Sequence, residues 1–76
     1  MLQPSVVRVP DVRGEYAGVA RHQLRLRGLR ARAIEPAGPV IGSRVRAQDP
    51  APGTNAKRGT VVRLYLVPED GVEYAV

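Results

Sequence analysis

Arginine and tyrosine side chains at alternating positions are the residues of this sequence best suited to chemistry. They occur in three short segments, 29–34, 43–48 and 60–67, where polar and apolar residues alternate. Alternation with a period of two is typical of a strand that buries one face. If the apolar residues face a core, the opposite face carries six candidate ligand-binding residues: Arg30, Arg32, Arg44, Arg46, Arg63 and Tyr65.

Guanidinium groups bind carboxylates and phosphates in a bidentate geometry, and a tyrosine ring can stack on a base or a sugar. The 76-residue chain carries a net charge of +5 from 12 basic and 7 acidic residues. This balance favours an anionic partner, such as nucleic acid, a polyanionic wall polymer or an acidic surface. The alternative is a solvated sheet face on which long arginine stems cover the backbone.

Groups that could perform catalysis are missing from the pattern. The single histidine, His22, falls in a predicted helix, and the chain contains no cysteine. A nucleophile needs a base beside it, and the acidic residues occur singly except for Glu69 and Asp70. Neither a metal-ligand spacing nor a glycine-rich phosphate loop is present. We predict that the protein is not an enzyme and uses no metal or cofactor.

A helix is predicted within residues 15–29. Apolar residues recur there at helical spacing, namely Ala17, Ala20 and Leu24. Gly28 stands where a helix ends, because glycine readily adopts the positive φ found at that position. Val19 and Leu26 lie seven residues apart and off this stripe, so we expect an exposed apolar pair that could contact a partner.

The remaining segments complete an α+β pattern in a single small domain. A short extended segment precedes the helix within 6–14, while 35–42 is a loop and 55–59 a turn by their glycines, prolines and polar residues. The order is therefore β-α-β-β-β, with one helix packed on one face of a three-stranded sheet. The core face of that sheet is expected to hold Ala31, Ala33, Val45, Ala47, Val62, Leu64 and Leu66.

Five motifs follow one another in a specific order: VPDVRG (9–14), GL (28–29), QDPAPGT (48–54), KRGT (57–60) and VVRLYLV (61–67). Together they resemble the PASTA domain of bacterial penicillin-binding proteins and Ser/Thr kinases. The resemblance covers residues 8–67, with 1–7 as an N-terminal extension and 68–76 as an acidic tail or linker. Its motif residues are expected to be architectural: Pro10, Gly28, Gln48, Pro50, Pro52, Gly53 and Gly59. The chain departs from the family at Tyr16, where a Ser/Thr-type helix cap is usual.

The resemblance implies a non-catalytic module that recognises peptidoglycan or muropeptide fragments, or another anionic cell-wall polymer, as a sensor for a kinase or penicillin-binding protein. The alternative is a spacer or interaction module that contacts neighbouring PASTA domains and binds no small ligand. A module that binds nucleic acid through its arginines is a third possibility. The resemblance implies an extracytoplasmic location within a larger membrane protein, whereas a standalone chain would be cytoplasmic. We expect no membrane insertion, because no segment is long and apolar enough.

Overall fold

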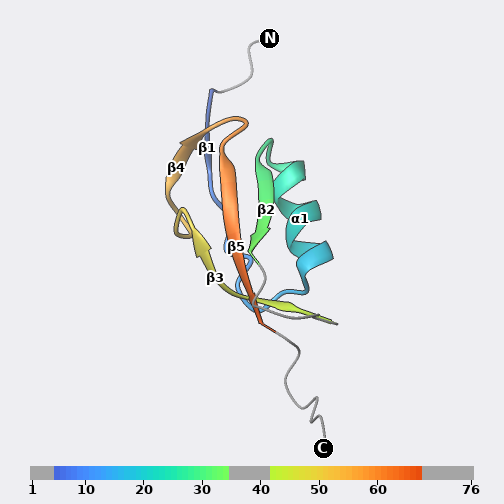
Figure 1. Ribbon diagram of the computed structural model, residues 1–76. Coiled ribbons are helices and arrows are strands. Elements are labelled where there is room, and N and C mark those ends of the chain that lie inside the picture. The colour runs from blue at the N-terminus through green and yellow to red at the C-terminus, as the bar shows by residue number, and fades with distance from the viewer. Residues whose placement is uncertain (1–4, 35–41, 68–76) are drawn as a thin grey trace, which may run out of the picture.

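One helix and five strands follow one another in residues 5–34 and 42–67, the parts of the chain that the computed structural model describes (Figure 1). The elements are β1 (Val6–Arg8), α1 (Ala17–Leu26), β2 (Arg30–Ile34), β3 (Arg44–Asp49), β4 (Asn55–Lys57) and β5 (Val61–Val67). The predicted α+β class is confirmed. Most of the predicted loop at 35–42, the acidic tail at 68–76 and residues 1–4 of the N-terminal extension lie outside the described residues.

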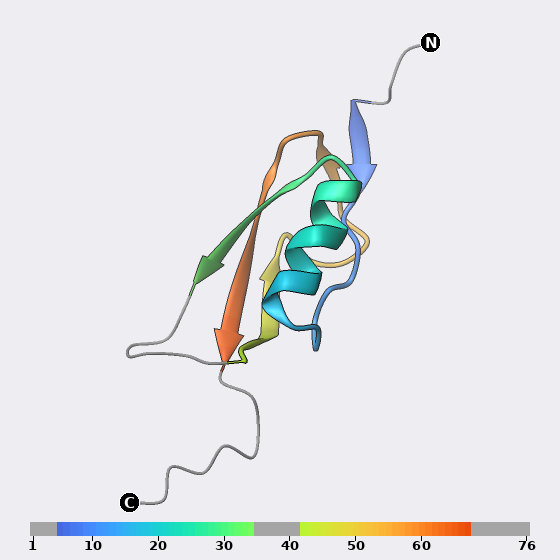
Figure 2. The same cartoon turned by 90° about the vertical axis from the view of Figure 1, so that its right-hand side faces the viewer.

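Strand β5 lies in the middle of a three-stranded sheet with the order β2-β5-β3. β2 runs parallel to β5, and β3 runs antiparallel to it. Helix α1 crosses one face of this sheet and contacts all three strands (Figure 2). The predicted packing of one helix on one face of a three-stranded sheet is therefore confirmed.

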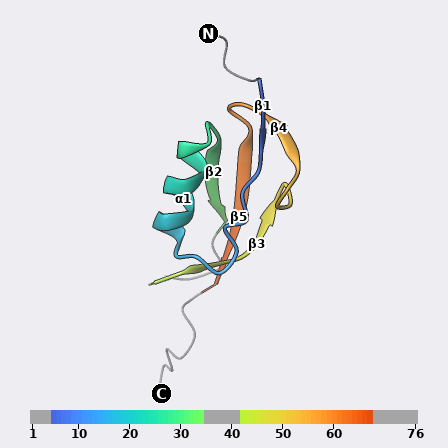
Figure 3. The ribbon, with the colours of Figure 1, turned by 180° about the vertical axis from the view of Figure 1, so that it is seen from behind.

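The prediction of a turn at 55–59 is wrong for its first part. Residues Asn55–Lys57 form β4, which pairs antiparallel with β1 in a second, two-stranded sheet, with Val6 opposite Lys57 (Figures 1 and 3). The turn that remains is formed by Arg58 and Gly59, and Gly59 has a φ of 85°. The strand partner lies at the other end of the chain, so the local composition of Asn55–Lys57 did not indicate the pairing.

The core is made of aliphatic side chains from the helix, the sheet and the segment that follows β1. Its buried members are Val9, Val12, Ala20, Leu24, Leu29, Val45, Val62, Leu64 and Leu66. Ala20 and Leu24 are both fully buried and belong to the predicted apolar stripe of α1. The stripe therefore holds the helix against the sheet by burying apolar surface, which is the main favourable term in folding.

Helix α1 ends as its sequence predicts. The N–H of Gly28 donates to the carbonyl of Arg25, and the N–H of Leu29 donates to the carbonyl of Leu24, both at 2.9 Å. This is the Schellman arrangement, which requires a positive φ at the glycine; here φ is 80°. The turn brings Leu29 into the core with Leu24 and leads directly into β2.

The helix begins without a side-chain cap. Tyr16 occupies the N-cap position, and its side chain makes no capping hydrogen bond. Instead the N–H of Ala17 donates to the carbonyl of Ser43 at 3.1 Å, and residues 14–15 exchange hydrogen bonds with Val45. The backbone before α1 thus pairs with the outer edge of β3, and this pairing replaces the cap expected of the family.

A β-bulge in β3 changes which residues face the core. Val45 pairs with Leu66 but Ala47 pairs with Tyr65, so the register shifts between them. A bulge adds one residue to one strand, and every later side chain then changes face. Ala47 therefore shares the face of Tyr65, and the prediction that Ala47 faces the core is wrong. Gln48 takes the inward position and is buried.

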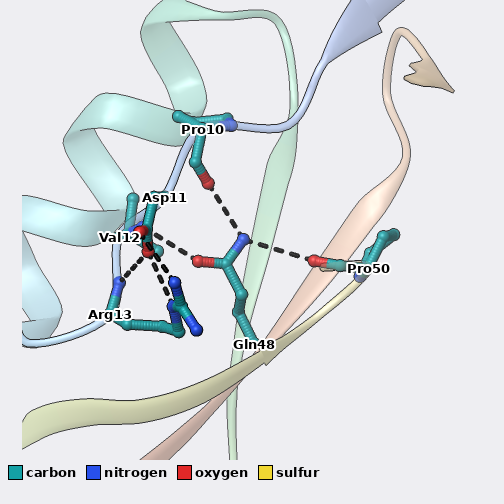
Figure 4. Close-up of polar contacts among 6 residues, drawn as sticks. All are labelled: Pro10, Asp11, Val12, Arg13, Gln48 and Pro50. Carbon is teal, nitrogen blue, oxygen red and sulfur yellow. Dashed lines mark hydrogen bonds and ion pairs between the residues drawn. The ribbon is translucent and has the colours of Figure 1, made fainter. Parts of the chain in front are cut away.

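The buried amide of Gln48 joins the two proline-containing segments (Figure 4). Its Oε1 accepts a hydrogen bond from the N–H of Val12 at 2.8 Å. Its Nε2 donates to the carbonyls of Pro10 at 2.9 Å and Pro50 at 3.2 Å. Every polar atom of the side chain has a partner, as burial requires. The QDPAPGT segment is therefore a structural corner that Gln48 ties to the segment after β1.

Candidate functional site

The three-stranded sheet presents arginines on its outer face, meaning the face turned away from α1. The parallel register places Arg32 opposite Arg63, Arg30 opposite Val61, and Ile34 opposite Tyr65. Register partners project from the same face of a sheet, and successive residues alternate between faces. The structure therefore brings together four of the six residues in the predicted set: Arg30, Arg32, Arg63 and Tyr65.

The arginines of the outer face differ in how far their charge is neutralised. Nη1 of Arg63 lies 3.5 Å from Oδ2 of Asp49, its register partner on β3, and both side chains are more than half exposed. Arg30 and Arg32 are exposed, and their guanidinium groups have no hydrogen bond or salt bridge to another described residue. The free guanidinium groups are thus concentrated on β2, at the edge of the sheet.

Apolar groups lie between these charges. Val61 is 45% exposed, and Ile34, Tyr65 and Val67 are half-buried. Among these residues, Tyr65 alone belongs to the predicted site. The face therefore offers cations and apolar contact area together, which suits a ligand with carboxylates and a partly apolar or carbohydrate body.

The other two predicted site residues lie on β3, which is separated from β2 by β5, and there Arg44 is the register partner of Val67. The guanidinium of Arg44 is 4.1 Å from the centroid of the Tyr16 ring, and its Nη2 donates to the Tyr16 hydroxyl at 3.0 Å. Its Nη1 donates to the carbonyl of Gly14 at 2.8 Å. Arg44 thus stabilises the start of α1 through a cation–π contact and two hydrogen bonds. Arg46 is exposed within the bulge of β3, beside Ala47.

Two further arginines, absent from the predicted site, stand beside β2. Arg21 and Arg25 are exposed on α1, one helical turn apart. They line an open hollow of about 660 Å³ whose other lining residues are Leu29, Arg30, Ala31, Arg32 and Val61. The spacing of Arg21 and Arg25 was visible in the sequence, but their position next to β2 depends on how the helix packs.

No catalytic arrangement is found in residues 5–34 and 42–67. His22 is exposed on α1, and no group of three or more His, Asp or Glu side chains in these residues could hold a metal ion. No helix in the same residues has the length and apolar character needed to cross a membrane.

A carboxylate with an altered pKa lies in the loop before α1. Hydrogen bonds from the Arg13 side chain and from its backbone N–H lower the pKa of Asp11 from 3.8 to about 2. The same pairing raises the pKa of Arg13. Both side chains are about half exposed, and Figure 4 shows them paired. The turn that contains Gly14 is closed by the N–H of Glu15, which donates to the carbonyl of Val12 at 3.2 Å. The Asp11–Arg13 pair belongs to the loop and not to the arginine-rich face.

The family model for the PASTA domain matches residues 7–68, which include every described element except the first residue of β1. The chain belongs to the PASTA domain family. No curated protein matches the chain. PASTA domains are non-catalytic binding modules related to the bacterial cell wall, and they typically lie outside the cytoplasm in membrane proteins.

The motif residues of this PASTA domain hold its segments together. The N–H of Gly59 donates to the carbonyl of Gly28 at 2.7 Å, which joins the KRGT turn to the end of α1. The N–H of Gly53, where φ is 85°, donates to the carbonyl of Val9 at 2.8 Å. With the hydrogen bonds of Gln48, these contacts give an architectural role to four of the five motifs, all except VVRLYLV.

Proposed function

We propose that this PASTA domain recognises uncrosslinked peptidoglycan or muropeptide fragments through the outer face of its sheet. The observation that carries the proposal is the placement of Arg32 and Arg63 on adjacent strands of one exposed face, with Arg30 and Tyr65 beside them. Free stem peptides carry carboxylates, and guanidinium groups pair with carboxylates in charge-assisted, bidentate hydrogen bonds. Tyr65 and Val61 supply contact area for the apolar or sugar part of the same ligand.

The proposed role is that of the wall-sensing module of a Ser/Thr kinase or penicillin-binding protein, with the domain on the cell-wall side of the membrane. Membership of the family supports this role, because PASTA domains typically occur in such settings. An anionic cell-wall polymer would be attracted by the same charges. It would not require the apolar residues between them, so we favour the muropeptide.

A titration followed by NMR tests the proposal. The ¹⁵N-labelled domain is titrated with a muropeptide whose stem carboxylates are free, and then with the same muropeptide after amidation. Amide shifts should cluster on Arg30, Arg32, Arg63 and Tyr65 with the first ligand and be much smaller with the second. Absence of shifts on these residues, or equal shifts with both ligands, would overturn the assignment.

Nucleic acid is an alternative ligand for the same arginines, and salt dependence separates the two. If several phosphates are contacted, the affinity for an oligonucleotide falls by roughly a thousandfold or more between 50 and 200 mM salt. A gel shift that is absent, or that does not respond to salt, removes nucleic acid from consideration.

Exposed apolar residues on α1 favour a second role in contacts with a neighbouring PASTA domain. Val19 is 42% exposed and Leu26 is 70% exposed, and the two lie on one side of the helix about two turns apart. Both could be covered by a partner without disturbing the core. Sedimentation of the chain and of a Val19→Thr/Leu26→Ser variant tests this role. Self-association that the substitutions abolish supports it, and a monomer at all concentrations contradicts self-association.

A further inference from the structure

Strand β2 has one paired edge and one edge that no described strand occupies. The N–H of Arg30 donates to the carbonyl of Thr60 at 2.9 Å, as part of the ladder with β5. Backbone groups alternate between the two edges of a strand, so those of Ala31 and Ala33 point away from β5. Figure 2 shows β2, in green, at the margin of the sheet beside α1. An edge of this kind can pair with an added strand.

The hollow beside β2 is lined by residues from both faces of the sheet. Arg21, Arg25 and Leu29 line it on the side of the helix, and Arg30, Arg32 and Val61 line it on the outer face. Residues from both faces of the sheet can line one hollow only because no described strand separates them. A strand added to β2 would lie in this hollow, with alternate side chains directed to each side.

The described residues around the hollow give it a strong positive charge. Among residues 5–34 and 42–67, the lining of the hollow includes four arginines and no acidic residue. None of the four guanidinium groups has a hydrogen bond or salt bridge to another described residue. Clustered like charges of this kind attract an anionic ligand and repel one another when it is absent.

The chemistry of the hollow favours a peptide over a phosphate polymer. A phosphate polymer would use only the arginines. It would leave the apolar surface of Leu29, Ala31 and Val61, and the unpaired backbone groups of Ala31 and Ala33, without partners. An extended peptide would give each of these groups a partner. Its backbone would pair with the edge of β2, its small apolar side chains would contact Leu29, Ala31 and Val61, and its carboxylates would bind the arginines.

We propose that the free edge of β2, flanked by Arg21 and Arg25, binds an extended acidic segment of a partner protein as a fourth strand of the sheet. This site extends beyond the outer face to which the muropeptide is assigned. It uses two arginines that the proposed muropeptide site does not use. Arg30 and Arg32 border both sites, so the two ligands would compete.

The test uses the full chain and a synthetic peptide of alternating Glu and Val residues. Strand addition should shift the amide protons of Ala31 and Ala33 and slow their exchange with solvent. The backbone control is the same peptide with N-methyl groups at alternate positions along the edge that pairs, because methylation removes hydrogen bonds while it leaves the charge unchanged. Loss of binding on methylation is expected, and equal binding by both peptides would overturn strand addition.

The arginines are tested with a matched pair of variants. Arg21→Gln/Arg25→Gln should weaken the peptide by about tenfold or more, since charge-assisted hydrogen bonds are lost. Arg8→Gln/Arg27→Gln removes the same charge from residues outside the hollow and should change the affinity much less. Equal losses in both variants, or tripolyphosphate binding as tightly as the peptide, would refute a peptide site. The muropeptide titration reports on Arg63 and Tyr65 instead, so the failure of one proposal is distinguishable from the failure of the other.

Discussion

Arg32 on β2 and Arg63 on β5 are direct register partners on the outer face of the sheet. Two positive side chains at paired positions of adjacent strands repel one another, and such pairs reduce the stability of a sheet. Asp49 relieves this repulsion only from the other side of β5, through its 3.5 Å contact with Arg63. Two like charges that lower the stability of a sheet are typical of a site where both are needed for binding, because functional sites commonly depart from the rules of stable packing.

Replacing Arg32 with Gln should leave the protein as stable or slightly more stable. The expected gain is about 0.2–1 kcal/mol at low salt, since the repulsion with Arg63 is removed. Asp49→Asn is the opposite control, because it leaves Arg63 without its carboxylate partner and should lower stability slightly. Urea denaturation at low and high salt measures both changes. A clear loss of stability in Arg32→Gln would show that Arg32 supports the fold.

Gln48 is expected to be the most sensitive polar residue of the domain. Gln48→Leu leaves the N–H of Val12 and the carbonyls of Pro10 and Pro50 without their partner, at a cost of about 1–3 kcal/mol for each group that stays buried. Gln48→Glu preserves the acceptor for Val12 but removes both donated hydrogen bonds when it is ionised. Thermal unfolding should place both variants well below the wild type, and the Glu variant should recover partly at low pH. A wild-type melting temperature in Gln48→Leu would contradict this role.

Two glycines near α1 should respond in opposite directions to the same substitution. Gly28 has a φ of 80°, which L side chains rarely adopt, so Gly28→Ala should cost about 1 kcal/mol or more, although the exposed Arg58 side chain can move away from the added Cβ. Gly18 lies within the helix, and nothing is within 4 Å of a Cβ built on it. Gly18→Ala should therefore stabilise the protein by roughly 0.5–1 kcal/mol. Chemical denaturation of both variants measures the difference, and the same sign for both would be inconsistent with the structure.

The carboxyl group of Asp11 should titrate only in strong acid, because it is paired with Arg13. Because the folded-state pKa of Asp11 is depressed from 3.8 to about 2, its contribution to stability is present above pH 3.8. This contribution is lost as the pH falls through that interval to about 2. The carboxyl ¹³C resonance of Asp11 should titrate near pH 2, and Arg13→Gln should move the midpoint up toward 3.8. A wild-type midpoint near 3.8 would show that the pair does not form in solution.

Local patterns predicted the elements of this fold but not all of their partners. The apolar stripe of α1, its end at Gly28 and the alternation of β2 and β5 depend on neighbouring residues, and each was predicted correctly. The bulge near Arg46 depends on how β3 meets β5, and it turned Ala47 outward and Gln48 inward. A one-residue shift of this kind has no signal in a strictly alternating segment.

Long-range contacts likewise decided which arginines are free. Arg44 and Arg32 occupy equivalent positions in alternating segments, yet the side chain of Arg44 is bound to Tyr16 and Gly14, while that of Arg32 makes no hydrogen bond or salt bridge to a described residue. Tyr16 stands out in the sequence as an unusual helix cap, but its partner is close only in the folded chain. Arg21 and Arg25 were missed for the same reason, since their relation to β2 depends on the packing of α1.

The most direct test of muropeptide recognition is the affinity for a free-carboxylate muropeptide, measured by calorimetry on three forms of the domain. The variant Arg32→Gln/Arg63→Gln should bind about tenfold or more weakly than the wild type, because charge-assisted hydrogen bonds to carboxylates are removed. The control variant Arg8→Gln/Arg27→Gln has the same net charge as Arg32→Gln/Arg63→Gln and should bind nearly as tightly as the wild type. Equal affinities in all three forms, or equal losses in the two variants, would contradict recognition by the outer face of the sheet.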